Sequence, residues 1–312
     1  MMEVAFGKKA NLGHRESEAR EHTGSRHDKT LTARMALMRA PGLAVQATGR
    51  WRRDLWQLLS VPLLGFLVLP LVALLLRTPP AHLIANLNQP AVLQAITLSL
   101  WTAGITTLLT IFFGTPVGYL LARRSFPLLR AVDTLIVLPT VLPPSVAGVA
   151  LLMAFGRRGI LGGVFGALDI HLAFTPAAVV LAQTFVAAPF YVRAAAAGFA
   201  SIGPEIEQAA ALDGASSWQV FRSIAFPLAR IGLLSGVAMT WARAMGEFGA
   251  TMIFAGNYPG RTQTMPLAIY LGFELDLDVA LTLAVLLMGC SFLVLLLVKS
   301  LLHREVQADS NW

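Results

Sequence analysis

Long apolar runs alternate with short polar stretches along this chain. Six runs contain at least the ~20 residues that an α-helix needs to cross the hydrocarbon core of a bilayer. They lie at about 56–76, 92–122, 133–155, 174–200, 228–255 and 279–299. The pattern predicts an all-α polytopic membrane protein with six transmembrane helices.

Composition supports the same class. Hydrophobic residues make up 56% of the 312 residues and charged residues 13%, which is too apolar for a soluble domain of this length. The single cysteine, Cys290, lies inside the last apolar run, so one chain can form neither a disulfide nor a thiolate metal site. We expect no metal site and no cofactor.

Positive charge is distributed unevenly between the two sides of these spans. With the N-terminus in the cytoplasm, nineteen of the 24 Lys and Arg lie on the cytoplasmic side and four lie in the opposite loops. This asymmetry predicts a multi-pass protein of the plasma (inner) membrane with both termini cytoplasmic. We expect lipid around the spans.

Three regions follow from this pattern. Residues 1–53 mix eleven cations with acids and three irregularly spaced histidines and have no apolar period, which predicts a disordered cytoplasmic tail rather than a metal site. Residues 54–302 form the transmembrane domain. Residues 303–312 form a cytoplasmic C-terminal tail.

The polar stretch between the fourth and fifth spans predicts two short capped helices. Pro204 suits the first position of a helix, and Gly214 suits its left-handed end. Ser216 and Gln219 match a capping box for a second helix, which Pro227 is expected to end.

We interpret this stretch, residues 201–227, as a docking element and call it the hairpin. Ile206, Ala209 and Ala210 share one face of its first helix, and their mostly small side chains let a partner's backbone approach. A DNA-binding helix-turn-helix is the other interpretation of the shape. However, three acids and one Arg give residues 204–226 a net charge near −2, which repels phosphate. We expect no nucleic-acid partner.

The hairpin resembles the EAA loop of binding-protein-dependent ABC importer permeases. That pattern is EAA, three residues, Gly, nine residues and I-x-L-P, and here it reads Gln208-Ala209-Ala210, Gly214 and Ile224-Ala225-Phe226-Pro227. Gln208 replaces the Glu, with Glu207 one position earlier, and Phe226 replaces the Leu. In this family the loop docks in a groove of the ATPase subunit. The resemblance therefore assigns ATPase coupling to Glu207, Gln208, Ala209, Ala210, Gly214, Ile224 and Pro227.

The resemblance also implies partners. A phosphate-binding P-loop requires Gly before its Lys-Ser/Thr pair, and neither Lys29 nor Lys299 follows Gly. We therefore expect a subunit that is not an enzyme and that acts with a separate ABC ATPase subunit and an extracytoplasmic anion-binding protein. The family, with the lack of an internal repeat, implies a homodimer.

Two further stretches are similar to molybdate permeases. One is 138–145, LPTVLPPS, followed by GRRG at 156–159; the other is 243–251, RAMGEFGAT, followed by an outer loop through Thr264. The resemblance covers about 94–302 and implies a molybdate/methionine permease-like fold and import of molybdate. Tungstate and sulfate permeases share parts of the pattern, so those anions stay open.

Prolines interrupt the third span. Pro139, Pro143 and Pro144 break the helix repeatedly, which a membrane tolerates only where the backbone is buried in protein or lines a wet cavity. Thr140 and Ser145 add hydroxyl groups. Two interpretations remain open: a wall of the anion pathway, or a packing kink without a ligand.

Arg243 and Glu247 form a charge pair inside the fifth span. Four residues apart, they share a helix face, and ionisable groups at this depth usually face a bundle interior or a cavity. The pair, with Thr251 nearby, either gates the pathway or ties helices or subunits together, and we favour the tie.

Two other classes of membrane protein fit the sequence less well. An ion-gradient-driven secondary transporter predicts several intramembrane acids, whereas Glu247 stands nearly alone. A membrane enzyme is disfavoured because no cluster of His, Cys or paired carboxylates lies at the end of a span.

Overall fold

The computed structural model describes the backbone of residues 41–124 and 127–309 and the side chains of residues 58–124 and 128–300. All elements in these ranges are helical, and no strand occurs among them. The predicted tail lies outside the described residues up to 40; a helix begins at Pro41. The chain divides into two compact units, Met1–Val72 and Ala73–Trp312.

Four predicted spans are continuous helices. They are α2 (Pro41–Arg77), α4 (Pro90–Arg123), α8 (Pro176–Ala200) and α15 (Leu277–Asp309). The segments Leu58–Arg77, Pro90–Arg123, Pro176–Ala200 and Leu277–Ser300 are long and apolar enough to cross a membrane. The Leu58–Arg77 segment of α2 has apolar residues on every face, as expected of a helix surrounded by lipid.

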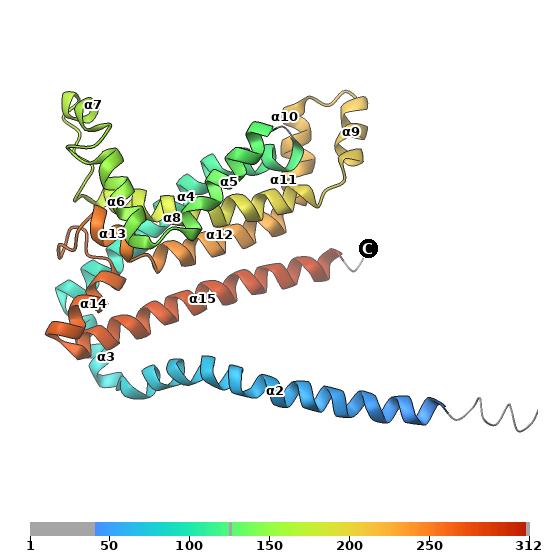
Figure 1. Ribbon diagram of the computed structural model, residues 1–312, viewed down its shortest axis with the longest axis horizontal. Helices are drawn as coiled ribbons and strands as arrows, with labels where there is room; N and C mark the ends of the chain where they lie inside the picture. The colour runs from blue at the N-terminus through green and yellow to red at the C-terminus, as the bar shows by residue number, and fades with distance from the viewer. Residues whose placement is uncertain (1–40, 125–126, 310–312) are drawn as a thin grey trace, which may run out of the picture. The chain divides into compact units, whose positions relative to one another are not determined.

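The third predicted span is a bent pair of helices, not one helix. It comprises α5 (Pro127–Val141) and α6 (Pro144–Phe155), which meet at 118° and diverge from the break (Figure 1). Pro143 is the N-cap of α6 and Pro144 its first residue. Because neither has an N–H to continue the hydrogen-bond ladder of α5, the helix ends there.

The fifth predicted span, 228–255, is also interrupted. Its main helix, α12 (Arg230–Met245), stops at Gly246, and a short helix, α13 (Gly249–Phe254), follows. At its other end α12 meets the second part of the hairpin at 70°. The number of spans reaches six only when two bent pairs are each counted as one span. These pairs are α5 with α6, and Ser217–Leu228 with α12.

Three shorter helices occupy the predicted loops: α3 (Pro80–Leu87), α7 (Gly162–Ala167) and α14 (Met265–Leu275). Two of them pack on α15. The amide of Asn86 in α3 donates to the Thr282 hydroxyl at 2.9 Å. A Cβ added to Gly272 in α14 would lie 2.9 Å from that of Ala280. The sequence pattern did not predict these helices.

Small residues let α4, α8 and α12 pack closely. A Cβ on Gly232 of α12 would lie 2.7 Å from the Cα of Gly198 in α8, so the two backbones are in the close contact that small residues allow. Buried hydroxyls add links between α4 and α8: Thr115 and Tyr191 lie 2.7 Å apart. This bundle supports both the hairpin and the two breaks.

Candidate coupling and pathway sites

The first half of the hairpin folds as the sequence predicts. Helix α9 (Pro204–Leu212) begins with Pro204 at its first position. Gly214 has φ of 88°, and the next N–H, of Ala215, donates to the Ala210 carbonyl at 3.0 Å. Ser216 and Gln219 form the capping box, the Gln219 Oε1 accepting the Ser216 N–H at 2.7 Å.

The second half corrects one prediction, because Pro227 does not end the helix. The chain continues through α10 (Ser217–Val220), a wide π turn η1 (Phe221–Ala225) and α11 (Phe226–Leu228). Pro227 lies in the first turn of α11, where its missing N–H leaves no bond unmade. The break falls instead at Ala229, the residue before α12.

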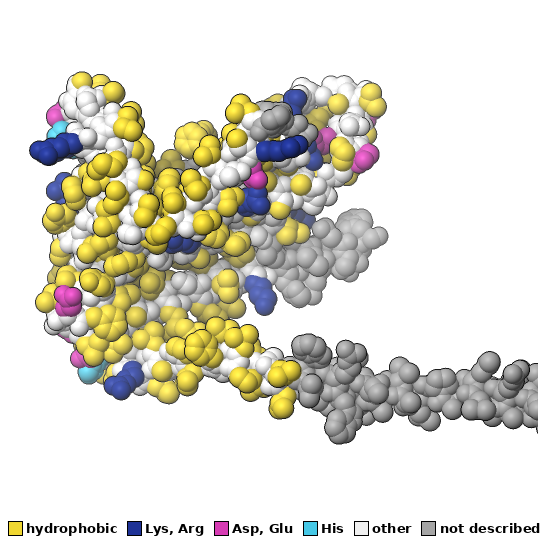
Figure 2. Space-filling view, in the orientation of Figure 1, with side chains coloured by type: hydrophobic (Ala, Val, Ile, Leu, Met, Phe, Trp, Pro, Cys, Tyr) yellow, Lys and Arg dark blue, Asp and Glu magenta, His cyan; other side chains and the backbone are white. Residues whose placement is uncertain are grey.

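The hairpin exposes large apolar side chains. No residue of α9 is buried, and exposure reaches 89% for Leu212 and 65% for Trp218. Hydrophobic side chains reach the surface at the α9 end of the bundle (Figure 2). Gln208 and Ala209 are exposed beside them. We call Ile206, Leu212 and Trp218 the apolar hairpin surface.

Glu207 lies on the inner side of α9 and binds the end of α4. Its Oε1 accepts a hydrogen bond from Arg123 Nε at 3.0 Å, and its Oε2 accepts one from the Tyr119 hydroxyl at 3.1 Å. The Arg123 Nη1 also donates to the Ile202 carbonyl at 3.2 Å. Both side chains of the ion pair are largely buried. Glu207 therefore holds the hairpin against α4.

Aromatic rings form a second attachment of the hairpin. The Tyr119 ring meets the rings of Phe199 and Phe221 edge-on, with centroids 5.2 Å apart in each pair. Trp218 stacks on Phe221 at 5.6 Å. These rings come from α4, α8 and the hairpin, so the hairpin is in contact with both long helices.

The two interrupted spans meet at their breaks. Gly249, at the start of α13, lies so close to Pro144, at the start of α6, that an added Cβ would be 2.5 Å from the proline Cβ. One turn further along α6, Gly148 packs against Ile253 and the Ala250 carbonyl. The two stretches that resemble molybdate permeases are therefore in direct contact.

The Arg243–Glu247 pair bridges the break between α12 and α13. Arg243 Nη1 lies 2.9 Å from Glu247 Oε2, and the Glu247 side chain is 1% exposed. Its other oxygen accepts the Ala250 N–H at 2.8 Å, at the start of α13. The carboxylate thus ties the two halves of one span, and Arg243 is the more exposed member of the pair.

The other predicted pathway residues are scattered. Thr140 is exposed, and its hydroxyl donates to the Val137 carbonyl at 2.7 Å. Ser145 is exposed, whereas Thr251 is fully buried and its hydroxyl has no partner among the described residues. Pro139 lines an apolar cavity of about 450 Å³ between α4, α5 and α8.

Comparison with known proteins identifies the family. The family model described as "Binding-protein-dependent transport system inner membrane component" matches residues 114–307, more than half of the chain. The chain belongs to this family. It is therefore the membrane-embedded, multi-pass permease subunit of an importer of this class. The family implies an ATPase and a substrate-binding protein as partners.

Several relatives resemble this permease over most of their length. The molybdenum transport system permease protein ModB of Mycobacterium tuberculosis is 42% identical over 74% of this chain and 88% of its own. The molybdate/tungstate permease protein WtpB of Thermococcus kodakarensis is 35% identical over 81% and 99%. The sulfate permease protein CysW of Synechococcus elongatus is 34% identical over 73% and 80%.

Solved structures show the same fold. A bacterial alginate ABC transporter has a TM-score of 0.67 at 15% identity, covering 83% of this permease and 96% of that chain. The MetNI methionine ABC transporter has a TM-score of 0.54 at 20% identity, covering 68% and 95%. The predicted ABC importer permease fold is confirmed.

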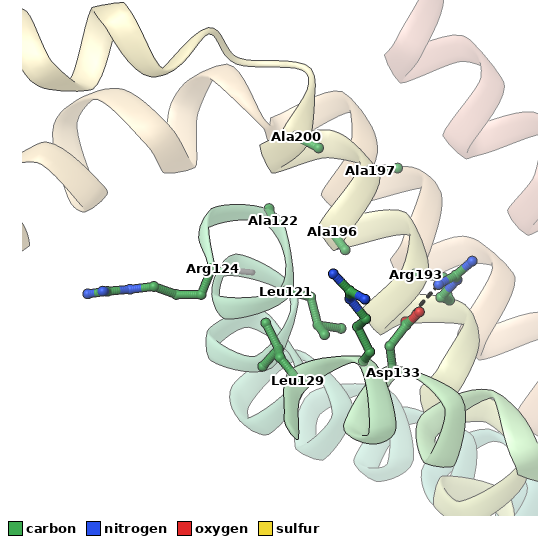
Figure 3. A pocket seen from close by; sticks show the side chains of 10 residues that line it. Leu121, Ala122, Arg124, Leu129, Asp133, Arg193, Ala196, Ala197 and Ala200 are labelled. Carbon is green, nitrogen blue, oxygen red and sulfur yellow. Dashed lines mark hydrogen bonds and ion pairs between the residues drawn. The ribbon is translucent and has the colours of Figure 1, made fainter. Parts of the chain in front are cut away.

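The structure adds an ion pair that sequence reasoning missed. Arg193 of α8 binds Asp133 of α5, with Nη1 and Oδ1 2.7 Å apart. Both line a cavity of about 550 Å³ near the hairpin end of the permease (Figure 3). Arg124 extends away from the other labelled side chains. The sequence does show an Arg inside the apolar run of the fourth span, which could have indicated an ion pair there. Nothing in the sequence identifies Asp133 as its partner.

Proposed function

We propose that this chain carries molybdate through the plasma membrane as the homodimeric permease of an importer whose ATPase subunits are separate chains. Similarity to named molybdenum permeases over nearly their whole length carries the proposal. Tungstate and sulfate are the alternative cargoes, because relatives named for them are also similar in sequence over most of this chain. The positive-inside pattern supports placing the hairpin and both termini in the cytoplasm.

The hairpin is the proposed docking site for the ATPase subunit. Its apolar hairpin surface, with Gln208 and Ala209 exposed beside it, suits insertion of a helix into a groove of the partner. Gly214 sets the turn, and Ala210, Ile224 and Pro227 contribute to the shape of the same hairpin. Glu207 acts from behind by holding α9 on α4.

Motion passes from the hairpin to the pathway through rigid contacts. The Glu207–Arg123 pair and the ring cluster move α4 and α8 with the hairpin. The proposed movement is a reorientation of the packed pair α6 and α13 about the breaks at Pro143–Pro144 and Gly246–Phe248. The Glu247 carboxylate keeps α13 linked to α12 during this movement. Alternating access then follows from opening and closing at this junction, which Arg243 flanks. Selectivity rests mainly with the anion-binding protein.

The test is ATP hydrolysis by the reconstituted permease–ATPase complex. Binding protein loaded with molybdate, tungstate or sulfate is added in turn. We expect the molybdate-loaded form to stimulate hydrolysis most. Equal or greater stimulation by the sulfate-loaded form would reassign the cargo, and no stimulation by any form would overturn the proposal.

A further inference from the structure

A further cavity lies beside α7. Figure 1 shows α7 at the end of the bundle opposite the hairpin. The volume of the cavity is about 620 Å³, and its walls come from the end of α6, the loop around α7, the segment before α8 and the loop after α13. Arg157, Arg261 and His171 line it, and no acidic side chain does. In the orientation we propose, this end faces outward, where the cargo arrives.

A tightly hydrogen-bonded turn fixes the position of Arg157. After α6 the chain folds back, so that the Ile160 N–H donates to the Met153 carbonyl at 2.8 Å and the Leu161 N–H to the Ala154 carbonyl at 3.0 Å. A Cβ on Gly159 would lie 2.4 Å from the Met153 oxygen. Only glycine fits there, and the turn that carries Arg157 has little freedom to move.

Arg261 comes from a second, equally ordered loop. The Tyr258 carbonyl accepts the N–H groups of Arg261, Thr262 and Gln263 at 3.1, 2.9 and 3.1 Å. The fully buried Thr262 hydroxyl accepts the Tyr258 N–H at 3.1 Å and donates to the Gly256 carbonyl at 3.2 Å. The backbone of this loop is therefore pre-organised.

Contacts connect the α13 loop to the segment before α8. The Phe174 N–H donates to the Phe254 carbonyl at 3.3 Å, and the rings of Phe174 and Tyr258 meet edge-on at 6.4 Å. The walls that carry the two arginines are thus held by the fold, and neither arginine has an acidic partner in the described part of the chain.

We propose that this cavity is an entry site for the cargo oxyanion, a tetrahedral dianion held by Arg157 and Arg261. The planar guanidinium group pairs well with two oxygens of one oxyanion. Both arginines are exposed, which keeps the affinity low enough for the ion to move on. This inference rests on the proposed function, which supplies the cargo class and the orientation.

The test measures oxyanion binding without the binding protein. The permease–ATPase complex is placed in lipid nanodiscs and dialysed to equilibrium against radiolabelled molybdate, with sulfate as competitor. We expect saturable binding that Arg157→Gln and Arg261→Gln each weaken about fivefold, the factor for ~1 kcal/mol at an exposed charge. Arg158→Gln is the matched control, because it removes the neighbouring charge outside the cavity lining.

Three results would overturn the proposal: no saturable binding by the wild-type complex, unchanged binding in both variants, or an equal loss in the control. A second arm measures the affinity of loaded binding protein for the same nanodiscs. If the two variants weaken that affinity but leave molybdate binding intact, the arginines bind the protein rather than the ion, and the proposal is wrong. Wild-type hydrolysis stimulated by loaded binding protein would keep the proposed function intact in each of these cases.

Discussion

The carboxylate of Glu207 accepts a hydrogen bond from Arg123 Nε at 3.0 Å, which joins helix α9 of the hairpin to the end of the long helix α4. The acid of the EAA-like stretch thus binds α4 of the permease itself. The next residue, Gln208, is exposed at the position where the family pattern has Glu. Neighbouring residues thus serve the observed attachment of the hairpin and the proposed contact with the ATPase.

Glu207→Gln should uncouple the hairpin from α4. The variant leaves the largely buried Arg123 without its charge partner, and a charge-assisted hydrogen bond contributes ~1.5–3 kcal/mol. We expect hydrolysis stimulated by loaded binding protein to fall about tenfold while the ATPase subunit still co-purifies. Glu205→Gln, on the exposed side of the same first turn, is the control, and an equal loss in it would contradict the role of the Glu207 contact.

Leu212→Asp should weaken binding of the ATPase subunit. Leu212 is 89% exposed on the hairpin, and a charge there disfavours insertion into an apolar groove. We expect about tenfold weaker association, a typical effect for an interface anchor, measured by titrating the detergent-solubilised permease with the ATPase. Leu168→Asp makes the same change beside α7, where 63% of the residue is exposed; association should be unaffected there.

Gly249→Ala should disturb the junction of the two breaks. The new Cβ would lie 2.5 Å from the Pro144 Cβ, whereas at Gly246 the nearest atom to an added Cβ is 3.6 Å away. Overpacking of this kind costs about 1–3 kcal/mol, so the thermal midpoint of the Gly249→Ala permease should fall below that of Gly246→Ala. Equal midpoints would show that α6 and α13 are not in tight contact.

Arg243→Met should destabilise the permease more than the double variant Arg243→Met/Glu247→Met. The single change leaves the buried Glu247 carboxylate without its partner, and breaking a buried pair costs about 3 kcal/mol or more. The double change removes both charges. Thermal unfolding separates the two cases, and a fully active double variant in a transport assay would exclude a gating role for the pair.

Local features of this fold were predictable because local residues determine them. Pro204, Gly214 and the Ser216–Gln219 pair specify helix ends through their own backbone preferences, and the structure shows all of them. The four continuous spans were equally predictable from the length of their apolar runs. The prolines of the third span predicted an interruption, but not that α5 and α6 would diverge by 118°.

Contacts between distant residues were not predictable from one sequence. Glu207 with Arg123, Arg193 with Asp133, and Pro144 with Gly249 are separated by 84, 60 and 105 positions, and no spacing rule relates them. Pro227 was misinterpreted for a related reason. A wide π turn just before it accommodates the proline, and a capping pattern does not reveal such a turn.

The most direct test of the account is molybdate uptake into proteoliposomes that contain the permease with its ATPase. We predict accumulation only when ATP is present on the side of the hairpin and loaded binding protein on the opposite side. Uptake driven by an ion gradient without ATP would contradict the account and identify a secondary transporter instead.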